Sequence, residues 1–108
     1  MGINHEIHSD TLVVRPTGLI NVQTSPELRE VLLKRYPGKG NIVINLSQVT
    51  YMDSSGLATL VEGLGIAGRG GGKLVLCEIR EKMIEDLLEI THLTGAFAVT
   101  DTEAAAVS

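Results

Sequence analysis

Residues 41–57 read NIVINLSQVTYMDSSGL and carry the strongest indication of the fold in this chain. Its first part, residues 42–46, is almost continuously apolar, as expected for a strand that is covered on both faces. Its last part places the tetrapeptide DSSG, residues 53–56, directly in front of an apolar repeat. The stretch therefore predicts a buried strand, a polar loop and the start of a helix, in that order.

The helix that follows the loop is amphipathic. Leu57, Leu60, Val61 and Leu64 recur at positions i, i+3, i+4 and i+7, which is the spacing of one helical face. The glycine-rich residues 68–72 end this helix. The next segment, LVLC at residues 74–77, then predicts a second buried strand.

The chain before this core predicts a hairpin and a helix. Residues 3–7 and 12–15 read as two strands joined by a polar turn at Ser9 and Asp10, with residues 16–18 ending the second strand. The helix starts at Ser25 as its N-cap, has Pro26 at its first position, and stops before Pro37.

After the second buried strand, residues 80–93 predict a third helix and residues 96–100 a short edge strand. A last helical turn or two follows in residues 101–107, capped by Asp101 or Thr102. Alternating strands and helices indicate an α/β fold with a mixed, mostly parallel sheet of about four to five strands flanked by about four helices. We expect residues 1–108 to form a single domain.

Composition restricts the function further. The chain has a formal net charge of −4, which argues against nucleic acid or an anionic membrane as its partner. Cys77 is the only cysteine and lies in an apolar run, so we expect a buried free thiol and a reducing compartment. Because no signal peptide or membrane-spanning length of apolar residues occurs, we expect a cytoplasmic protein without direct membrane insertion.

Two motifs that could bind a ligand do not fit their sites. GRGGGK at residues 68–73 lies between a helix and a strand, whereas a phosphate-binding loop leads from a strand into a helix. His5 and His8 are three residues apart on a predicted strand, so they point to opposite faces, and His92 is distant in sequence. We expect neither a metal site nor a cofactor.

The two serines of DSSG leave two readings open. Catalysis by Ser54 or Ser55 is disfavoured, because the G-x-S-x-G pattern is absent and no histidine has a supporting context, so we do not expect an enzyme. The tetrapeptide can serve as a helix cap alone. It can also be a substrate for phosphorylation, because a helix N-terminus carries a phosphate at low cost.

Three segments resemble STAS domains, and specifically bacterial anti-sigma factor antagonists (anti-anti-sigma factors). They are GLINVQTSPELREVL at residues 18–32, NIVINLSQVTYMDSSGLATLVE at residues 41–62, and GGKLVLCEIREKMIEDLLEITHL at residues 71–93. The likeness covers nearly the whole chain, and DSSGL is its most specific part.

The resemblance implies a phosphoprotein that regulates transcription by partner switching. The second serine of the motif, Ser55, is implied to be phosphorylated by an ATP- or ADP-bound partner that is both a serine kinase and an anti-sigma factor. The unphosphorylated form is implied to bind this partner and free the sigma factor, the phosphorylated form not to bind, and a serine phosphatase to restore binding. The residues implied to contact the partner are Asp53, Ser54, Gly56, Leu57 and Asn21.

One residue departs from the family pattern, since Asn21 stands where the family often has Asp, in the loop beside the phosphorylation site. This exchange bears on contacts with the kinase and not on the fold. The resemblance also leaves an alternative function, a STAS scaffold subunit of a stress-signalling assembly or transport complex without a phosphorylation cycle. We expect a monomer or a weak homodimer.

Overall fold

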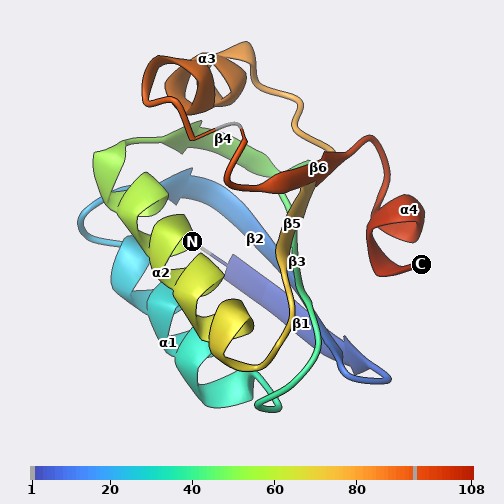
Figure 1. The fold of residues 1–108 in the computed structure, drawn as a ribbon. Coiled ribbons are helices and arrows are strands. Elements are labelled where there is room, and N and C mark those ends of the chain that lie inside the picture. The colour runs from blue at the N-terminus through green and yellow to red at the C-terminus, as the bar shows by residue number, and fades with distance from the viewer. Residues whose placement is uncertain (1, 94) are drawn as a thin grey trace.

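The structure is a computed structural model that describes residues 2–93 and 95–108, and Figure 1 shows its strands and helices. The strands are β1 (Gly2–His8), β2 (Thr11–Ile20), β3 (Ile42–Asn45), β4 (Val49–Met52), β5 (Leu74–Cys77) and β6 (Ala98–Thr100). The helices are α1 (Ser25–Arg35), α2 (Ser54–Arg69), α3 (Lys82–Ile90) and α4 (Glu103–Val107).

The strands form one sheet in the order β1-β2-β3-β5-β6, and β4 pairs with the second half of β2. Every pairing is parallel except that of β1 with β2, which is the expected hairpin. The predicted α/β fold with a mixed, mostly parallel sheet is therefore confirmed. The strand β4 was not predicted, because its two central residues, Thr50 and Tyr51, are exposed and interrupt the apolar pattern.

β2 also continues beyond its predicted end, through Pro16 to Ile20. On the side of β2 that faces β3 and β4, the N–H of Leu12 donates to the carbonyl of Asn41 and the N–H of Gly18 donates to the carbonyl of Gln48. Pro16 is an even number of residues from both, so its nitrogen points to the same side. Pairing with β3 ends at Val14 and pairing with β4 begins at Gly18. Pro16 lies in the gap between these two partners, where its missing N–H leaves no ladder bond unmade.

Both faces of the central strands are covered. On one face Ile42, Ile44, Leu74 and Leu76 pack with residues of α1 and α2, which lie side by side in Figure 1. On the other face Val43, Val75 and Cys77 pack with Ala106 of α4. This double coverage explains why β3 and β5 are apolar at nearly every position.

Helix starts agree with the prediction to within two residues, and the largest difference is at α3, which was expected over residues 80–93 and spans Lys82–Ile90. Thr24, not Ser25, is the N-cap of α1, and its side chain makes no capping hydrogen bond. Thr102 caps α4 as expected, since its side chain accepts a hydrogen bond from the N–H of Ala105. His5 pairs with Val14 and His8 with Thr11, so the two histidines lie on opposite faces of the sheet, as predicted.

The glycine-rich turn after α2 is a close-packed connection to β5. A Cβ on Gly72 would lie 1.9 Å from the carbonyl oxygen of Gly40, and one on Gly70 would lie 2.0 Å from the hydroxyl of Tyr36. Burial raises the pKa of the Cys77 thiol to about 11, with the charges of Glu78 and Glu103 adding to the effect. Cys77 therefore remains a protonated, buried thiol near neutral pH.

A polar cluster joins α4 to the sheet. The Arg15 guanidinium donates to both carboxylate oxygens of Glu103, at 2.7 Å each, and also to Asn4 and Glu6. The Asn45 amide donates to Glu103 at 3.0 Å. The hydrogen bond from Arg15 holds the pKa of the Glu103 carboxyl below its usual range, against the raising effect of partial burial, and the Asn45 bond adds to the lowering.

We expect Glu103→Gln to destabilise the fold by about 1–2 kcal/mol near pH 7, because it removes a charge-assisted pair with Arg15. The pKa of Glu103 is lower in the folded state than its ordinary value of 4.5. The stability that this carboxylate contributes is thus complete above that value and lost as the pH falls through the lowered pKa. Urea unfolding between pH 3 and pH 7 should show the two proteins converging at acid pH, and a constant difference over this range would contradict the assignment.

Candidate functional site

The predicted site lies where β2 and β4 end side by side at the carboxyl edge of the sheet. Ile20 and Met52, their last residues, are paired in register. The N–H of Asp53 donates to the carbonyl of Ile20 at 3.2 Å. The loop that follows β2, residues 21–24, is thereby held beside the residues that open α2. Loops at the carboxyl ends of parallel strands are the usual binding positions in α/β folds.

Asp53 is the N-cap of α2. Its backbone is extended, and its carboxylate oxygen Oδ1 accepts a hydrogen bond of 2.9 Å from the N–H of Ser55. Its carbonyl accepts the first intrahelical bond, from Leu57 at 3.1 Å. Such a cap contributes about 1 kcal/mol to stability. Of the three residues that could have capped this helix, Asp53 does so, and both serines are left on the first turn.

The serines differ in exposure. Ser54 is the first residue of α2 and is exposed, whereas Ser55 is the second and is half-buried. Within the described residues neither serine hydroxyl has a hydrogen-bond partner. Both hydroxyls are therefore free to react, on a backbone that Asp53 holds in place.

Gly56 and Leu57 form the base of the loop. Gly56 is buried, and a Cβ there would lie 2.6 Å from Cγ of Met52 and 2.8 Å from Cγ2 of Ile20. Leu57 is only 7% exposed and belongs to the main core. The Leu57 side chain thus packs into the core at the start of α2.

Asn21 shapes the neighbouring loop. Its Oδ1 accepts hydrogen bonds from the N–H groups of Gln23 and Thr24, at 2.9 and 3.1 Å. Its carbonyl accepts from Ser25 at 2.7 Å. Because an Asp carboxylate can accept the same two bonds, the loop geometry does not distinguish Asn from Asp at this position. The exchange changes the charge of the loop and leaves its shape.

Exposed apolar side chains occur on the elements next to the two loops. Leu19 and Tyr51, paired on β2 and β4, are 50% and 41% exposed, and Val22 in the loop after β2 is 71% exposed. On α2 an uncharged stripe follows Ser54 at helical spacing, and its members Ala58, Val61 and Gly65 are all exposed. We call the side chains of this set the apolar rim, which leaves out Gly65 because it has no side chain. The rim consists of Leu19, Val22, Tyr51, Ala58 and Val61.

The rim was not found from the sequence. The apolar repeat placed Val61 on the core face of α2, but Val61 is 41% exposed, because Gly56, Leu60, Gly63 and Ala67 define the buried face instead. The signal that could have found it is the spacing of Ser54, Ala58, Val61 and Gly65, a second face without charges on a surface helix.

No three His, Cys, Asp or Glu side chains of residues 2–93 and 95–108 are grouped so that they could hold a metal ion. Over the same residues, every helix is too short or too polar to cross a membrane.

The STAS domain family matches residues 2–106. An anti-sigma-B factor antagonist of Staphylococcus epidermidis is 35% identical to this chain, over 94% of this chain and 95% of its own length. Among solved structures, an anti-sigma factor antagonist from Mycobacterium paratuberculosis superposes with a TM-score of 0.83 at 25% identity, covering 98% of this chain and 90% of its own.

The fold is also that of the Bacillus cell fate determinant SpoIIAA, whose structure is known in two forms. The unphosphorylated form matches with a TM-score of 0.73 at 18% identity, covering 98% of this chain and 94% of its own. The phosphorylated form matches with a TM-score of 0.72 at 17% identity, covering 98% and 96%.

We expect Gly56→Ala to destabilise the fold by about 1–3 kcal/mol, because its Cβ would overlap the buried side chains of Met52 and Ile20. The matched control is Gly68→Ala in the same helix, where a Cβ meets nothing within 4 Å. That exchange should stabilise α2 by up to about 1 kcal/mol. Urea denaturation measures both effects, and equal stability of the two variants would show that the loop base is not closely packed.

Proposed function

Because this chain belongs to the STAS domain family, and within it to the anti-sigma factor antagonists, we propose that Ser55 is its phosphoacceptor. The chain is a non-enzymatic regulator. Its partner is an anti-sigma factor that is also a serine kinase and holds ATP or ADP. The unphosphorylated chain binds this partner through the loops around Ser55 and releases the sigma factor. Phosphorylation prevents binding, and a serine phosphatase reverses it.

The observation that carries the proposal is the placement of Ser55. It is the second residue of α2, its N–H is bonded to Asp53, and its hydroxyl has no partner among the described residues. A kinase therefore meets a fixed backbone with a free nucleophile. Ser54 is more exposed, but it is the first residue of the helix. The Asp53 carboxylate bonds to the N–H of Ser55 and therefore does not hold Ser54 directly.

The fold can carry the phosphate. A group at the second position of a helix lies near the unpaired N–H groups and the positive end of the helix dipole, which together favour a negative charge. No part of the core has to move, since Ser55 is only half-buried and, unlike Leu57, does not belong to the packed core. The two forms of SpoIIAA match this chain with nearly equal TM-scores, 0.73 and 0.72, which is consistent with a phosphate that leaves the fold unchanged.

The interface with the partner tolerates a phosphate on Ser55 less well than the fold does. Val22, in the loop beside the serines, and Val61, on the same face of α2 as Ser54, are exposed and offer apolar area to bury. A phosphate adds about −1.5 to −2 charge units next to the Asp53 carboxylate and has to be desolvated when the rim is covered. A penalty of about 3 kcal/mol weakens binding more than a hundredfold.

The departure at Asn21 fits this scheme without altering it. Asn21 keeps the hydrogen bonds that shape its loop, so the docking surface is retained. The absent carboxylate makes the loop beside Ser55 less negative. Asn21→Asp therefore changes the charge presented to the kinase and its bound nucleotide while preserving the loop.

We expect incubation with the cognate serine-kinase anti-sigma factor and ATP to add one phosphate to the wild type and none to Ser55→Ala, as measured by intact mass. Ser54→Ala is the matched control and should still gain one phosphate. Phosphate that persists on Ser55→Ala and disappears from Ser54→Ala would move the site to Ser54. The absence of phosphate from the wild type, with self-assembly into large particles, would favour a scaffold subunit without a phosphorylation cycle.

A further inference from the structure

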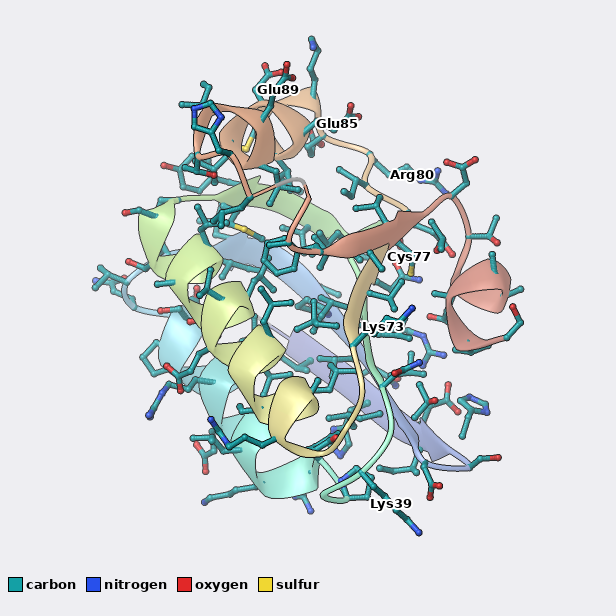
Figure 2. The ribbon with its side chains drawn as sticks, in the orientation of Figure 1. Lys39, Lys73, Cys77, Arg80, Glu85 and Glu89 are labelled. Carbon is teal, nitrogen blue, oxygen red and sulfur yellow. The ribbon has the colours of Figure 1, made fainter. Side chains whose placement is uncertain are left out.

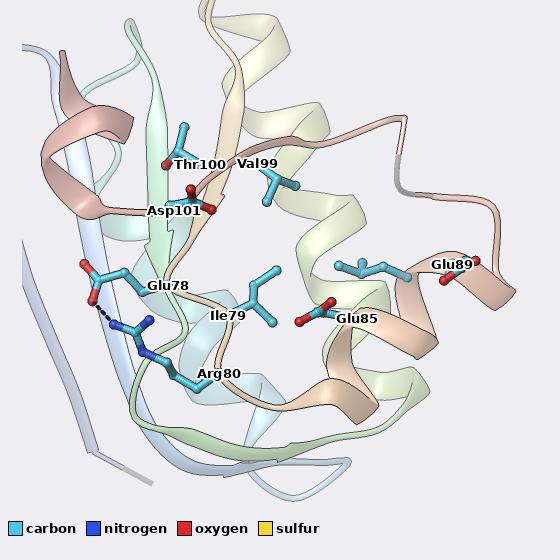
Figure 3. Close-up of a pocket in the computed structure, with 9 residues that line it drawn as sticks. Glu78, Ile79, Arg80, Glu85, Glu89, Val99, Thr100 and Asp101 are labelled. Carbon is cyan, nitrogen blue, oxygen red and sulfur yellow. Dashed lines mark hydrogen bonds and ion pairs between the residues drawn. The ribbon is translucent and has the colours of Figure 1, made fainter.

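A cavity of about 690 Å³ lies away from the serines (Figure 3). Three segments form it: residues 78–80 after β5, the helix α3, and residues 99–101 at the end of β6. None of its lining residues belongs to the loop 53–57 or to the apolar rim. It is therefore a second concave surface, with its own composition.

The floor of this cavity is apolar. Leu88 of α3 is 3% exposed and belongs to the main core, and Ile79 packs against the same core. Val99 of β6 is 48% exposed. Figure 3 shows Ile79 and Val99 pointing into the space between α3 and β6. An apolar side chain of a partner can bury the open side of Val99 by entering between them.

The edge of the cavity is acidic. The Glu78 carboxylate is already used, because it pairs with Arg80 at 3.4 Å and accepts the N–H of Glu103 at 2.9 Å. Arg80 is the one cation of the lining, and Glu78 neutralises it. The remaining carboxylates are Glu85, Glu89 and Asp101, which are exposed and form no ion pair with any described residue.

These carboxylates face the cavity from two sides. Glu85 and Glu89 are four residues apart on α3, while Asp101 follows β6 across the cavity. Figure 2 shows Glu85 and Glu89 on α3, at the opposite end of the molecule from Lys39. No lysine lines the cavity. The cavity therefore combines an apolar floor with an excess of negative charge at its edge, which Lys82 on α3, already paired with Asp86, offsets only in part.

We propose that this cavity is a second docking site, for a basic segment of a partner protein that carries one apolar anchor between Lys or Arg residues. The anchor fills the space between Ile79, Leu88 and Val99, and the flanking cations meet Glu85, Glu89 and Asp101. Charge complementarity selects this occupant. The acidic edge of the cavity repels a second copy of the chain, because the chain has a net charge of −4. It repels nucleic acid and anionic lipid for the same reason.

The site goes beyond the phosphorylation switch, because it uses different residues and a different chemistry. It gives the chain a way to bind one protein through the loop at Ser55 and another through the cavity at α3.

The test uses a seven-residue peptide with a central Leu, two Arg on each side, and a Gly at each blocked end. Fluorescence anisotropy at low and moderate salt should show saturable binding to the wild type at peptide concentrations below about 1 mM. Glu85→Gln with Glu89→Gln should weaken binding about fivefold to tenfold and reduce its salt dependence. The matched control is Glu27→Gln with Glu30→Gln, which changes the net charge equally on exposed positions of α1.

Two further arms separate docking from general attraction of a cation. A peptide with Gly in place of the central Leu should bind at least threefold more weakly, and Val99→Ser should remove most of that difference. Amide shifts in a titration should fall on α3, β6 and residues 78–80. Equal weakening by the α1 control, equal binding of the Gly peptide, shifts centred on residues 53–57, or no saturable binding would each overturn the proposal.

Discussion

The structure depends on the junction between Ile20 and Asp53. The Asp53 N–H bonds to the Ile20 carbonyl, and the Asp53 carboxylate bonds to the N–H of Ser55. The first bond holds the ends of β2 and β4 together, and the second starts α2 at that point. One residue thus joins the sheet to the helix that presents both serines. Gly56 makes this possible, because any Cβ at its position would collide with Met52 and Ile20.

The rest of the molecule keeps this junction rigid. α1 and α2 cover one face of the sheet, and α4 is attached to the other face by the ion pair between Arg15 and Glu103. The apolar rim and the cavity at α3 therefore both lie on elements that the core holds in place. The apolar rim offers exposed apolar area on the elements next to a group that is proposed to become a dianion. The cavity at α3 is acidic from the start, so the two surfaces select partners by different rules.

Much of the fold could be predicted, because β3 and β5 are buried on both faces and their apolar runs record this directly. β4 could not, since a strand with two exposed central residues has no run to recognise. The end of β2 was misplaced because Pro16 is tolerated only in the gap between β3 and β4, which is a property of the sheet and not of the local sequence. Close packing explains Gly63, whose Cβ would meet Leu74 at 2.5 Å, but not Gly65, which is exposed.

The site divides in the same way. The motif at residues 53–56 is local, so its role as a helix start was readable, while the identity of the cap among three candidates needed the structure. The apolar rim and the acidic cavity gather residues from separate segments, and no spacing in the sequence announces them.

The proposed switch requires that a phosphate on Ser55 abolishes docking without changing the fold. Its most direct test is calorimetric titration of the kinase-type anti-sigma factor with stoichiometrically phosphorylated and unphosphorylated protein, alongside an amide spectrum of each form. We expect affinities that differ more than a hundredfold, which corresponds to about 3 kcal/mol, with spectral changes confined to residues near the start of α2. Equal affinities, or amide changes spread over the core strands, would contradict it.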